Sequence, residues 1–286
     1  MQSNTLKNMK TDSPWVILKL GERMFGIPSD YVLEMVVIPT LALLPSVPDY
    51  VRGVINLRGS VIMVVDLRIR LDMESALVER DRLIELMEER KHDHVNWLNE
   101  LENAVREDRE FKLATDPHMC KFGKWYDTYK PKNVIMENHL AKFDEPHKHI
   151  HSLATTAIDL VKHGEKEQAL ELLEHERHGT LETMINLFNT AGKLLRDTSR
   201  EIVLVLVNGD RKIGITVDSV ESVEPLKEGS FEEIELSIIK SSSIVTQTGK
   251  LEKTDKIVML IEALALFEGT IDIGNDLEIP EETSVE

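Results

Sequence analysis

Residues 54–65, VINLRGSVIMVV, decide the fold class of this chain. Two runs rich in β-branched residues flank the short turn Arg58-Gly59-Ser60, a pattern that is typical of a β-hairpin. The apolar runs WVILKL (residues 15–20) and IVLVLV (residues 202–207) predict further strands. The second run precedes Asn208-Gly209-Asp210, whose Asn-Gly step predicts a tight hairpin turn. We therefore expect β-structure near both ends of the chain.

The two strand-rich flanks repeat each other. Residues 21–27, GERMFGI, match residues 209–215, GDRKIGI, at a constant offset of 188, which also pairs Asp30 with Asp218 and Val32 with Val220. Hairpin chemistry fixes turn residues but does not fix the Asp and Val that follow them. The shared register therefore favours two similar β-subdomains over two hairpins that only share turn chemistry.

The segment between the flanks is predicted to be helical. Its apolar residues recur at spacings of three, four or seven, which place them on one face of a helix. Segments at residues 132–143 and from Pro146 onward bring the total to about four helical pieces, which indicates an antiparallel bundle. This bundle is expected to interrupt the β domain, with entry near residues 72–77 and exit near residues 196–201. The inward stripes are predicted to hold Met87, His94, Leu98, Leu101 and Val105, then Leu170, Leu173, Leu181, Met184, Phe188, Ala191 and Leu195.

Composition excludes several classes of function. The 286 residues carry 51 acids against 34 Lys and Arg, a net charge of −17, which argues against nucleic-acid and anionic-membrane partners. The lone cysteine excludes an intramolecular disulfide and is typical of a reducing compartment. The longest uncharged run, residues 35–48, has 14 residues and three prolines, too few and too broken for direct membrane insertion. No signal peptide opens the chain, so we expect a soluble, cytoplasmic protein.

Four residues of the helical segment predict a metal site. All ten histidines and the cysteine lie within residues 92–178. His147 and His151 are four residues apart, so both imidazoles leave one helix face and can reach one ion. His94 lies on the inward stripe of the first helix, and Cys120 lies in a predicted connecting loop. Three neutral imidazoles and one thiolate form a four-coordinate set suited to Zn²⁺.

Residue types alone leave a second interpretation open, in which these side chains are satisfied members of an ordinary core. Catalytic interpretations fit less well. HKHIH at residues 147–151 lacks the Glu that serves as base in a zinc-protease helix, and four protein ligands leave no open position for water. A metal-dependent hydrolase or an oxygen-binding bundle is therefore the least favoured alternative, and we expect no enzyme activity and no catalytic residue.

The flanks resemble the bacterial chemotaxis adaptor CheW. Residues 50–59, YVRGVINLRG, with VIMVVDLR at 61–68, resemble the hallmark hairpin of that family, and residues 25–28 and 214–220 resemble two other stretches. Near residues 239–255 the chain departs from the Gly-rich hairpin usual in the family. The resemblance implies two small β-barrels in a non-catalytic adaptor that bridges a chemoreceptor's cytoplasmic hairpin tip to the histidine kinase CheA.

The same resemblance implies where a partner is bound. Arg58 would lie at the receptor-contacting surface, with Glu34, Val36 and Asn56 as weaker candidates. The alternative for Arg58 is a turn residue that bonds to local carbonyls.

The middle of the chain resembles the chemoreceptor zinc-binding (CZB) domain. HVNW at residues 94–97, CKFGKW at 120–125 and HKHIH at 147–151 carry the resemblance. It implies a four-helix bundle that binds zinc through three His and one Cys, which would be His94, Cys120, His147 and His151. Such domains are implicated in sensing zinc or oxidants such as hypochlorous acid, so Cys120 is also the candidate redox-sensing residue.

Together these observations predict an α+β protein, a discontinuous CheW-like double β-barrel with an inserted antiparallel four-helix bundle. The expected parts are an N-terminal tail (1–14), a first CheW-like half (15–76), the CZB-like bundle (77–198), a second CheW-like half (199–268) and an acidic tail (269–286). We expect a scaffold whose adaptor surface is tuned by the inserted domain. The alternative is that zinc is purely structural in an ordinary adaptor. A homodimer is left open.

Overall fold

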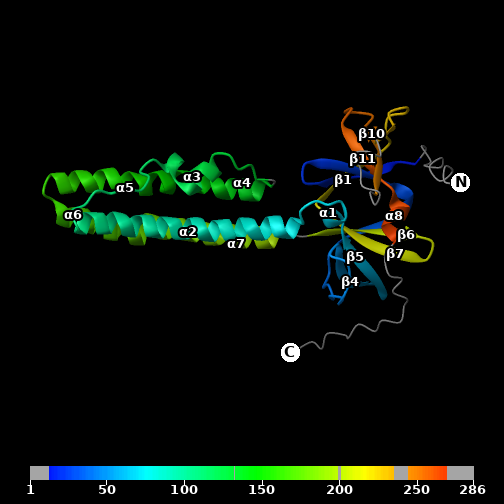
Figure 1. Cartoon of the computed structure of the whole chain (residues 1–286), viewed down its shortest axis with the longest axis horizontal. Helices are drawn as coiled ribbons and strands as arrows, with labels where there is room; N and C mark the ends of the chain where they lie inside the picture. Colours follow the sequence, from blue (N-terminus) through cyan, green and yellow to red (C-terminus); the bar gives the residue numbers. More distant parts are fainter. Residues whose placement is uncertain (1–12, 132, 199–200, 235–243, 269–286) are drawn as a thin grey trace. The chain divides into compact units, whose positions relative to one another are not determined.

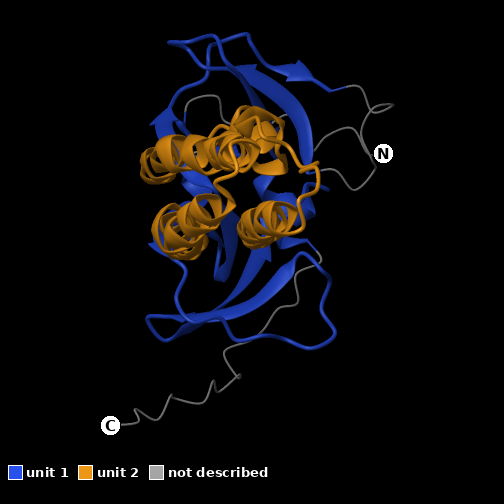
Figure 2. Ribbon diagram, turned by 90° about the vertical axis from the view of Figure 1, so that its left-hand side faces the viewer, with its two compact units in different colours: residues 1–76, 200–286 blue, residues 77–199 orange. Residues whose placement is uncertain are grey.

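The chain contains two compact units in the computed structural model, which describes residues 13–131, 133–198, 201–234 and 244–268. Met1–Ala76 and Arg200–Glu286 form one unit, called here the β unit, and Leu77–Ser199 form the other, the helical unit (Figure 2). The predicted tails lie outside the described residues, except for residues 13 and 14. The chain is therefore a mixed α+β protein, and the helical unit is inserted in the sequence of the β unit.

The β unit contains two sheets (Figure 1). Over the described residues, the six-stranded sheet has the order β8-β1-β2-β11-β10-β9, and the five-stranded sheet has the order β3-β6-β7-β5-β4. The strands are β1 (Trp15–Leu20), β2 (Arg23–Pro28), β3 (Val32–Val37), β4 (Val51–Leu57), β5 (Ser60–Asp66), β6 (Ile202–Asn208), β7 (Arg211–Val217), β8 (Ser219–Glu224), β9 (Glu232–Glu233), β10 (Val245–Lys250) and β11 (Ile257–Ile261). The short helices are η2 (Ser29–Tyr31), α1 (Leu67–Arg70) and α8 (Ala263–Phe267). The strands predicted from the apolar runs are confirmed.

The repeat in the sequence corresponds to two equivalent hairpins. Leu20 pairs with Arg23 in the β1–β2 hairpin, and Asn208 pairs with Arg211 in the β6–β7 hairpin, at the same offset. Each loop opens with a glycine at φ 59°, which fits a turn with glycine at its first central position. The expected role of the Asn-Gly step was wrong in detail, because Asn208 ends β6 and the turn consists of Gly209 and Asp210.

Each sheet takes strands from both flanks of the sequence. β3 follows the first hairpin but pairs with β6, whereas β8 follows the second hairpin and pairs with β1. Two parallel pairs, β2 with β11 and β5 with β7, join the remaining strands. Among the described strands, the end strands of neither sheet pair with each other, so the closed barrels that the resemblance implies are not observed. Residues 239–243 of the divergent segment lie outside the described residues, and the rest of it includes β10, which forms an antiparallel pair with β11.

The helical unit consists of long helices around one hydrophobic core (Figure 1). α5 packs against α6, and α4 packs against α7. Its elements are α2 (Ala76–Arg106, whose first residue belongs to the β unit), η3 (Pro117–Met119), α3 (Lys121–Tyr126), α4 (Val134–Leu140), η4 (Ala141–Phe143), α5 (Asp144–Lys162), α6 (Lys166–Glu176), the π-helical turn η5 (Arg177–Leu181) and α7 (Glu182–Thr198). None of the helices that the structure describes is long and apolar enough to span a membrane.

The predicted inward stripes are confirmed, with one residue less buried than the others. Leu170 is half-buried, and every other predicted member is buried. Successive inward residues Leu173 and Leu181 are eight positions apart, one more than two regular turns provide. The π-helical turn η5 lies between them and absorbs the extra residue, so the stripe stays on one face.

Candidate functional site

Three elements of the helical unit bring four predicted ligands together. His94 comes from α2, Cys120 precedes α3, and His147 and His151 come from α5. One ligand atom of each residue lies within 4.8 Å of the corresponding atoms of the other three. The three histidines are buried and Cys120 is half-buried. The cluster is therefore compact enough for one ion and has one side closer to solvent.

Cys120 does not lie in a simple loop, and this corrects the prediction. It caps α3, because its Sγ accepts a hydrogen bond from the Gly123 backbone N–H at 3.1 Å. A Cβ at Gly123 would lie 1.9 Å from the carbonyl oxygen of Pro117, so only glycine fits at this turn. Phe122 is buried in the core on the inner side of α3. The capped helix thus holds the sulfur close to the histidines.

Backbone carbonyls orient two of the histidine rings. The ring Nδ1 of His94 lies 2.7 Å from the Arg90 carbonyl oxygen, and the Nδ1 of His151 lies 3.1 Å from the Ala114 carbonyl oxygen. A carbonyl only accepts, so both Nδ1 atoms carry the proton and both Nε2 atoms carry a lone pair. These two Nε2 atoms are buried without a hydrogen-bond partner. The third histidine presents its Nε2 to the Cys120 Sγ at 3.2 Å.

Burial sets the charge of the cluster. It lowers the pKa of His147 to about 3 and that of His151 to about 4, with smaller contributions from the neighbouring imidazoles. Burial also lowers the pKa of His94. The three rings are therefore neutral at pH 7, as metal ligands must be. Burial raises the pKa of the Cys120 thiol, so only a nearby cation would keep its sulfur as a thiolate.

This donor set fits zinc. Zinc prefers four nitrogen and sulfur ligands in a compact arrangement. Ligating histidines usually donate their other ring N–H to a carbonyl or carboxylate, as His94 and His151 do. The Nε2 lone pairs of His94 and His151 are buried and have no hydrogen-bond partner in the protein. Buried polar atoms are almost always hydrogen-bonded, so these two atoms favour a bound ion at this site.

The other histidines lie apart from this cluster. His149 lies between His147 and His151 on α5, but its half-exposed ring pairs with Glu176 at 3.2 Å. His139 is not among the predicted inward residues, yet it is buried on α4, and its Nε2 donates to the Leu187 carbonyl oxygen at 2.8 Å. Its partner is thus a protein atom, which explains its burial without an ion. Its position three residues after buried Met136 on the same helix is the signal that was available.

The motifs alone did not predict the hydrogen bond that Trp97 makes. Trp97 is buried, and its indole N–H donates to the carbonyl oxygen of Ala114 at 2.7 Å. This is the carbonyl that orients His151. The available signal was the spacing, because Trp97 lies three residues after His94 on the inward side of α2. Trp125, the other tryptophan of the motifs, stacks on Tyr129 with ring centroids 4.5 Å apart.

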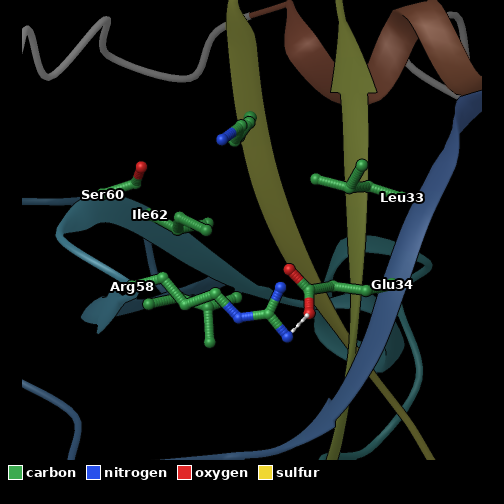
Figure 3. A pocket seen from close by; sticks show the side chains of 7 residues that line it. Leu33, Glu34, Arg58, Ser60 and Ile62 are labelled. Carbon is green, nitrogen blue, oxygen red and sulfur yellow. Dashed lines mark ion pairs between the residues drawn. The ribbon is translucent and has the colours of Figure 1, made fainter.

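Two of the candidate partner-binding residues, Arg58 and Glu34, lie together in the β unit (Figure 3). Arg58 and Gly59 form the β4–β5 turn with φ of 53° and 82°, as a type I′ turn requires. The Arg58 guanidinium is 80% exposed and pairs with Glu34 of β3 at 3.0 Å, rather than bonding to turn carbonyls. Both residues line a surface pocket with Leu33 and Lys212.

The two weaker candidates have local structural roles. The Asn56 side chain accepts a hydrogen bond from the Gly59 N–H at 3.0 Å and so stabilises the turn. Val36 of β3 packs, partly buried, against the core of the five-stranded sheet. On the opposite face of β3, three apolar side chains are exposed: Leu33, Met35 and Val37. Of these three side chains, Leu33 lines the same pocket as Arg58, so the surface around Arg58 combines one charged pair with one exposed apolar group.

Comparison with known proteins finds family matches for two parts of the chain. Residues 14–93 match the CheW-like domain, and residues 94–158 match the chemoreceptor zinc-binding domain. A 64-residue stretch is 34% identical to the chemotaxis protein CheW of Treponema pallidum (strain Nichols), and it covers 22% of this chain and 38% of that protein. The chain thus spans well under two thirds of this relative. Among solved structures, the scaffolding protein TtCheW from Thermoanaerobacter tengcongensis has a TM-score of 0.39 and 15% identity, over 87% of this chain and 88% of that one.

Proposed function

Because the chain combines a CheW-like domain with a chemoreceptor zinc-binding domain, we propose that it is a non-catalytic adaptor of a bacterial chemotaxis system. In this proposal the β unit links a chemoreceptor's cytoplasmic hairpin tip to the histidine kinase CheA. The family match and the identity to a CheW protein support it. The exposed Arg58, with Glu34 and Leu33 of β3 beside it, is the surface we assign to the receptor.

We assign residues 15–76 and 199–268 to one CheW-like domain and residues 77–198 to the zinc-binding domain. Two observations support this division. The compact units change at Ala76/Leu77 and at Ser199/Arg200. Each sheet contains strands from both flanks, so neither flank forms a sheet of its own. On this assignment the two sheets correspond to the two barrels of the family, and the helical unit corresponds to its four-helix bundle.

The helical unit binds one Zn²⁺ through His94, Cys120, His147 and His151. The single observation that carries this proposal is the convergence of four ligand atoms within 4.8 Å, with two buried Nε2 atoms left without a protein partner. When bound, the ion supplies the positive charge that keeps the Cys120 sulfur deprotonated. One Zn²⁺ with three neutral imidazoles and one thiolate has a net charge of +1, and this site costs far less to bury than the bare ion.

The inserted unit tunes the adaptor through Cys120. Attack of its thiolate on hypochlorous acid gives a sulfenic acid and releases chloride, and this removes the anionic sulfur from the ligand set. Three imidazoles then hold the ion more weakly, and the core around them loosens. Both ends of the helical unit continue into the β unit, so a change in its packing acts on the adaptor at two points of the chain.

The test combines metal content with partner binding. We expect one zinc per purified chain, lost on addition of one equivalent of oxidant, and an altered affinity for a receptor hairpin fragment after chelation or oxidation. Unchanged affinity and kinase output would remove the switch and leave zinc as a structural ion. In that case Cys120→Ser lowers the Tm and leaves receptor binding intact. A purified chain without zinc would contradict the metal assignment itself.

A further inference from the structure

His94 and His151 both present Nε2 to the other ligands, but the carbonyl groups that accept from their Nδ1 atoms are held in place in different ways. The Arg90 carbonyl belongs to α2, four residues before His94, so the helix itself fixes its position. The Ala114 carbonyl belongs to the irregular segment between α2 and η3. No regular backbone ladder fixes a carbonyl in such a segment, so another contact must hold it in place for His151.

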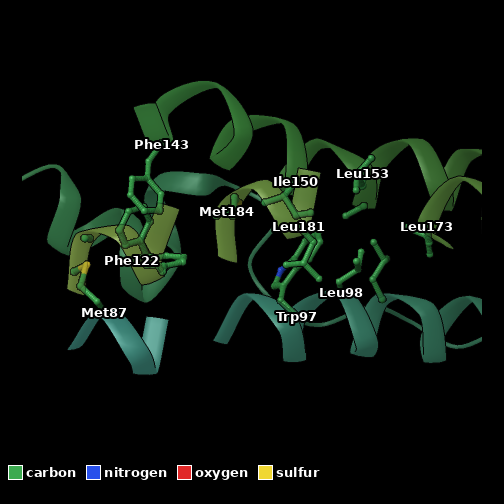
Figure 4. Packing of buried hydrophobic residues seen from close by; sticks show 14 of the residues in the cluster. Met87, Trp97, Leu98, Phe122, Phe143, Ile150, Leu153, Leu173, Leu181 and Met184 are labelled. Atoms are coloured by element: carbon green, nitrogen blue, oxygen red, sulfur yellow. The ribbon is translucent and has the colours of Figure 1, made fainter. Parts of the chain in front are cut away.

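Trp97 supplies that contact. Its indole N–H donates to the Ala114 carbonyl oxygen at 2.7 Å, and the same oxygen accepts the Nδ1–H of His151 at 3.1 Å. A carbonyl oxygen has two lone pairs, so it can accept both bonds. The Trp97 ring is 5% exposed and points from α2 into the core (Figure 4). It also packs edge-on against Phe111 of the same irregular segment, with centroids 5.1 Å apart.

We propose that Trp97 is a positioning residue of the metal centre, whose indole N–H fixes the Ala114 carbonyl and thereby holds His151 in the tautomer with Nε2 facing the other ligands. The inference rests on the proposed zinc site and adds to it a residue that does not itself bind the ion. Mutation of a residue that orients a metal ligand in this way commonly lowers the metal affinity by about 10–100-fold.

The test compares two tryptophans of the same unit. Trp97→Phe keeps an aromatic ring in the core and removes the N–H. Trp125→Phe is the matched control, because it also removes one indole N–H, from a ring that stacks on Tyr129 instead. Zinc affinity is measured by competition with a chelator. The position of the His151 ring proton is measured by ¹⁵N NMR in the metal-free full-length protein.

We expect zinc to bind about 10–100-fold more weakly to Trp97→Phe and to change less than about threefold in Trp125→Phe. In the metal-free protein, His151 keeps its proton on Nδ1 in the wild type and the control and populates both tautomers in Trp97→Phe. Equal zinc affinity and an unchanged tautomer in Trp97→Phe would overturn the inference. A wild-type chain that binds no zinc would contradict the proposed site instead, and the tautomer measurement would still decide the role of Trp97.

A second substitution separates the hydrogen bond from packing. Benzothienylalanine at position 97 has nearly the shape of tryptophan but carries sulfur in place of the N–H. We expect it to reproduce the loss of zinc affinity and the mixed tautomer of Trp97→Phe. Wild-type behaviour of this variant beside a loss in Trp97→Phe would show that packing alone caused the loss, and the proposal would fall.

Discussion

Two buried polar clusters of this protein differ in what completes them. In the β unit, Arg68 donates from Nε and Nη2 to the two carboxylate oxygens of Asp218, and Gly21 N–H donates to the same carboxylate. In the helical unit, His94 and His151 each keep one buried nitrogen without a protein partner. Interior polar groups are almost always hydrogen-bonded, so the second cluster requires a group from outside the chain. The first cluster is completed by protein atoms, and on the proposed function the second is completed by an ion.

Acid should affect the two units differently, and this is the largest expected effect. The pKa of His147 is lowered from 6.5 to about 3, and that of His151 from 6.5 to about 4. Below pH 6.5 the unfolded chain therefore binds protons that the folded unit does not. Stability is complete above pH 6.5 and is lost as the pH falls toward 4. For the metal-free helical unit, linkage gives a loss on the order of 3 kcal/mol for each of these two histidines.

Hydrogen exchange followed by mass spectrometry measures this effect in each unit separately. All ten histidines lie within residues 92–178, so the β unit contains none and provides an internal control. Between pH 6.5 and 5 we expect protection to fall in the helical unit far more than in the β unit, after correction for the intrinsic exchange rate. Equal slopes in the two units would contradict the assignment of neutral, buried histidines.

Disrupting the cluster of Arg68 and Asp218 in the β unit should have the next largest effect. Asp218→Asn removes the carboxylate that pairs with the buried Arg68 guanidinium, and removing one partner of a buried ion pair typically costs about 3–5 kcal/mol. We expect a lower midpoint of urea unfolding for the β unit and an unchanged zinc content. Asp30→Asn is the matched control at the equivalent position of the repeat, where the exposed carboxylate accepts a bond from Ser13. A zinc loss in Asp218→Asn would show that the two clusters are not independent.

Replacing the glycine beside the cysteine should have a moderate effect confined to the metal centre. Gly123→Ala places a Cβ 1.9 Å from the Pro117 carbonyl oxygen, so the capped turn must open. We expect about 2–3 kcal/mol of destabilisation of the helical unit and weaker zinc binding. Gly192→Ala, where the Cβ meets only a flexible Arg196 nitrogen at 3.6 Å, should be neutral or stabilising by about 0.5–1 kcal/mol. Similar effects of both substitutions on zinc affinity would contradict the role of the turn.

Local patterns were sufficient to predict the parts of the structure that depend on neighbouring residues. Short apolar runs rich in β-branched residues predicted the strands, and spacings of three or four residues predicted the inward helical stripes, because helical spacing selects one buried face. The spacing of His147 and His151 placed two ligands on one face for the same reason. That His94 and Cys120 join them depends on tertiary packing, and the family resemblance rather than spacing gave the stronger indication.

Contacts between distant segments were not predictable from local pattern. β3 pairs with β6, and β8 pairs with β1, so each strand joins a sheet with strands from the other flank of the sequence. These pairings depend on non-local packing, and the sequence of a single strand does not indicate its partner. The π-helical turn η5 was not predicted, although the eight-residue spacing from Leu173 to Leu181 indicates it. The loop expected at Cys120 is a capped helix, because a cysteine is not among the residues usually considered as caps.

The exposed turn should show the smallest effect on stability and the clearest effect on binding. The Arg58 side chain is 80% exposed in its pair with Glu34, and such surface pairs contribute about 0–1 kcal/mol. In Arg58→Ala, both the arginine and the alanine have a Cβ and adopt the same positive φ, so the backbone strain is similar. We therefore expect a stability change below about 0.5 kcal/mol. Binding to a receptor hairpin fragment should weaken about tenfold or more, as for an arginine at the centre of an interface. Arg23→Ala, at an exposed arginine in another strand, is the control for loss of charge alone. If Arg58→Ala binds the fragment as the wild type does, the receptor surface lies elsewhere on the β unit; if it mainly unfolds the sheet, Arg58 is a structural residue of the turn.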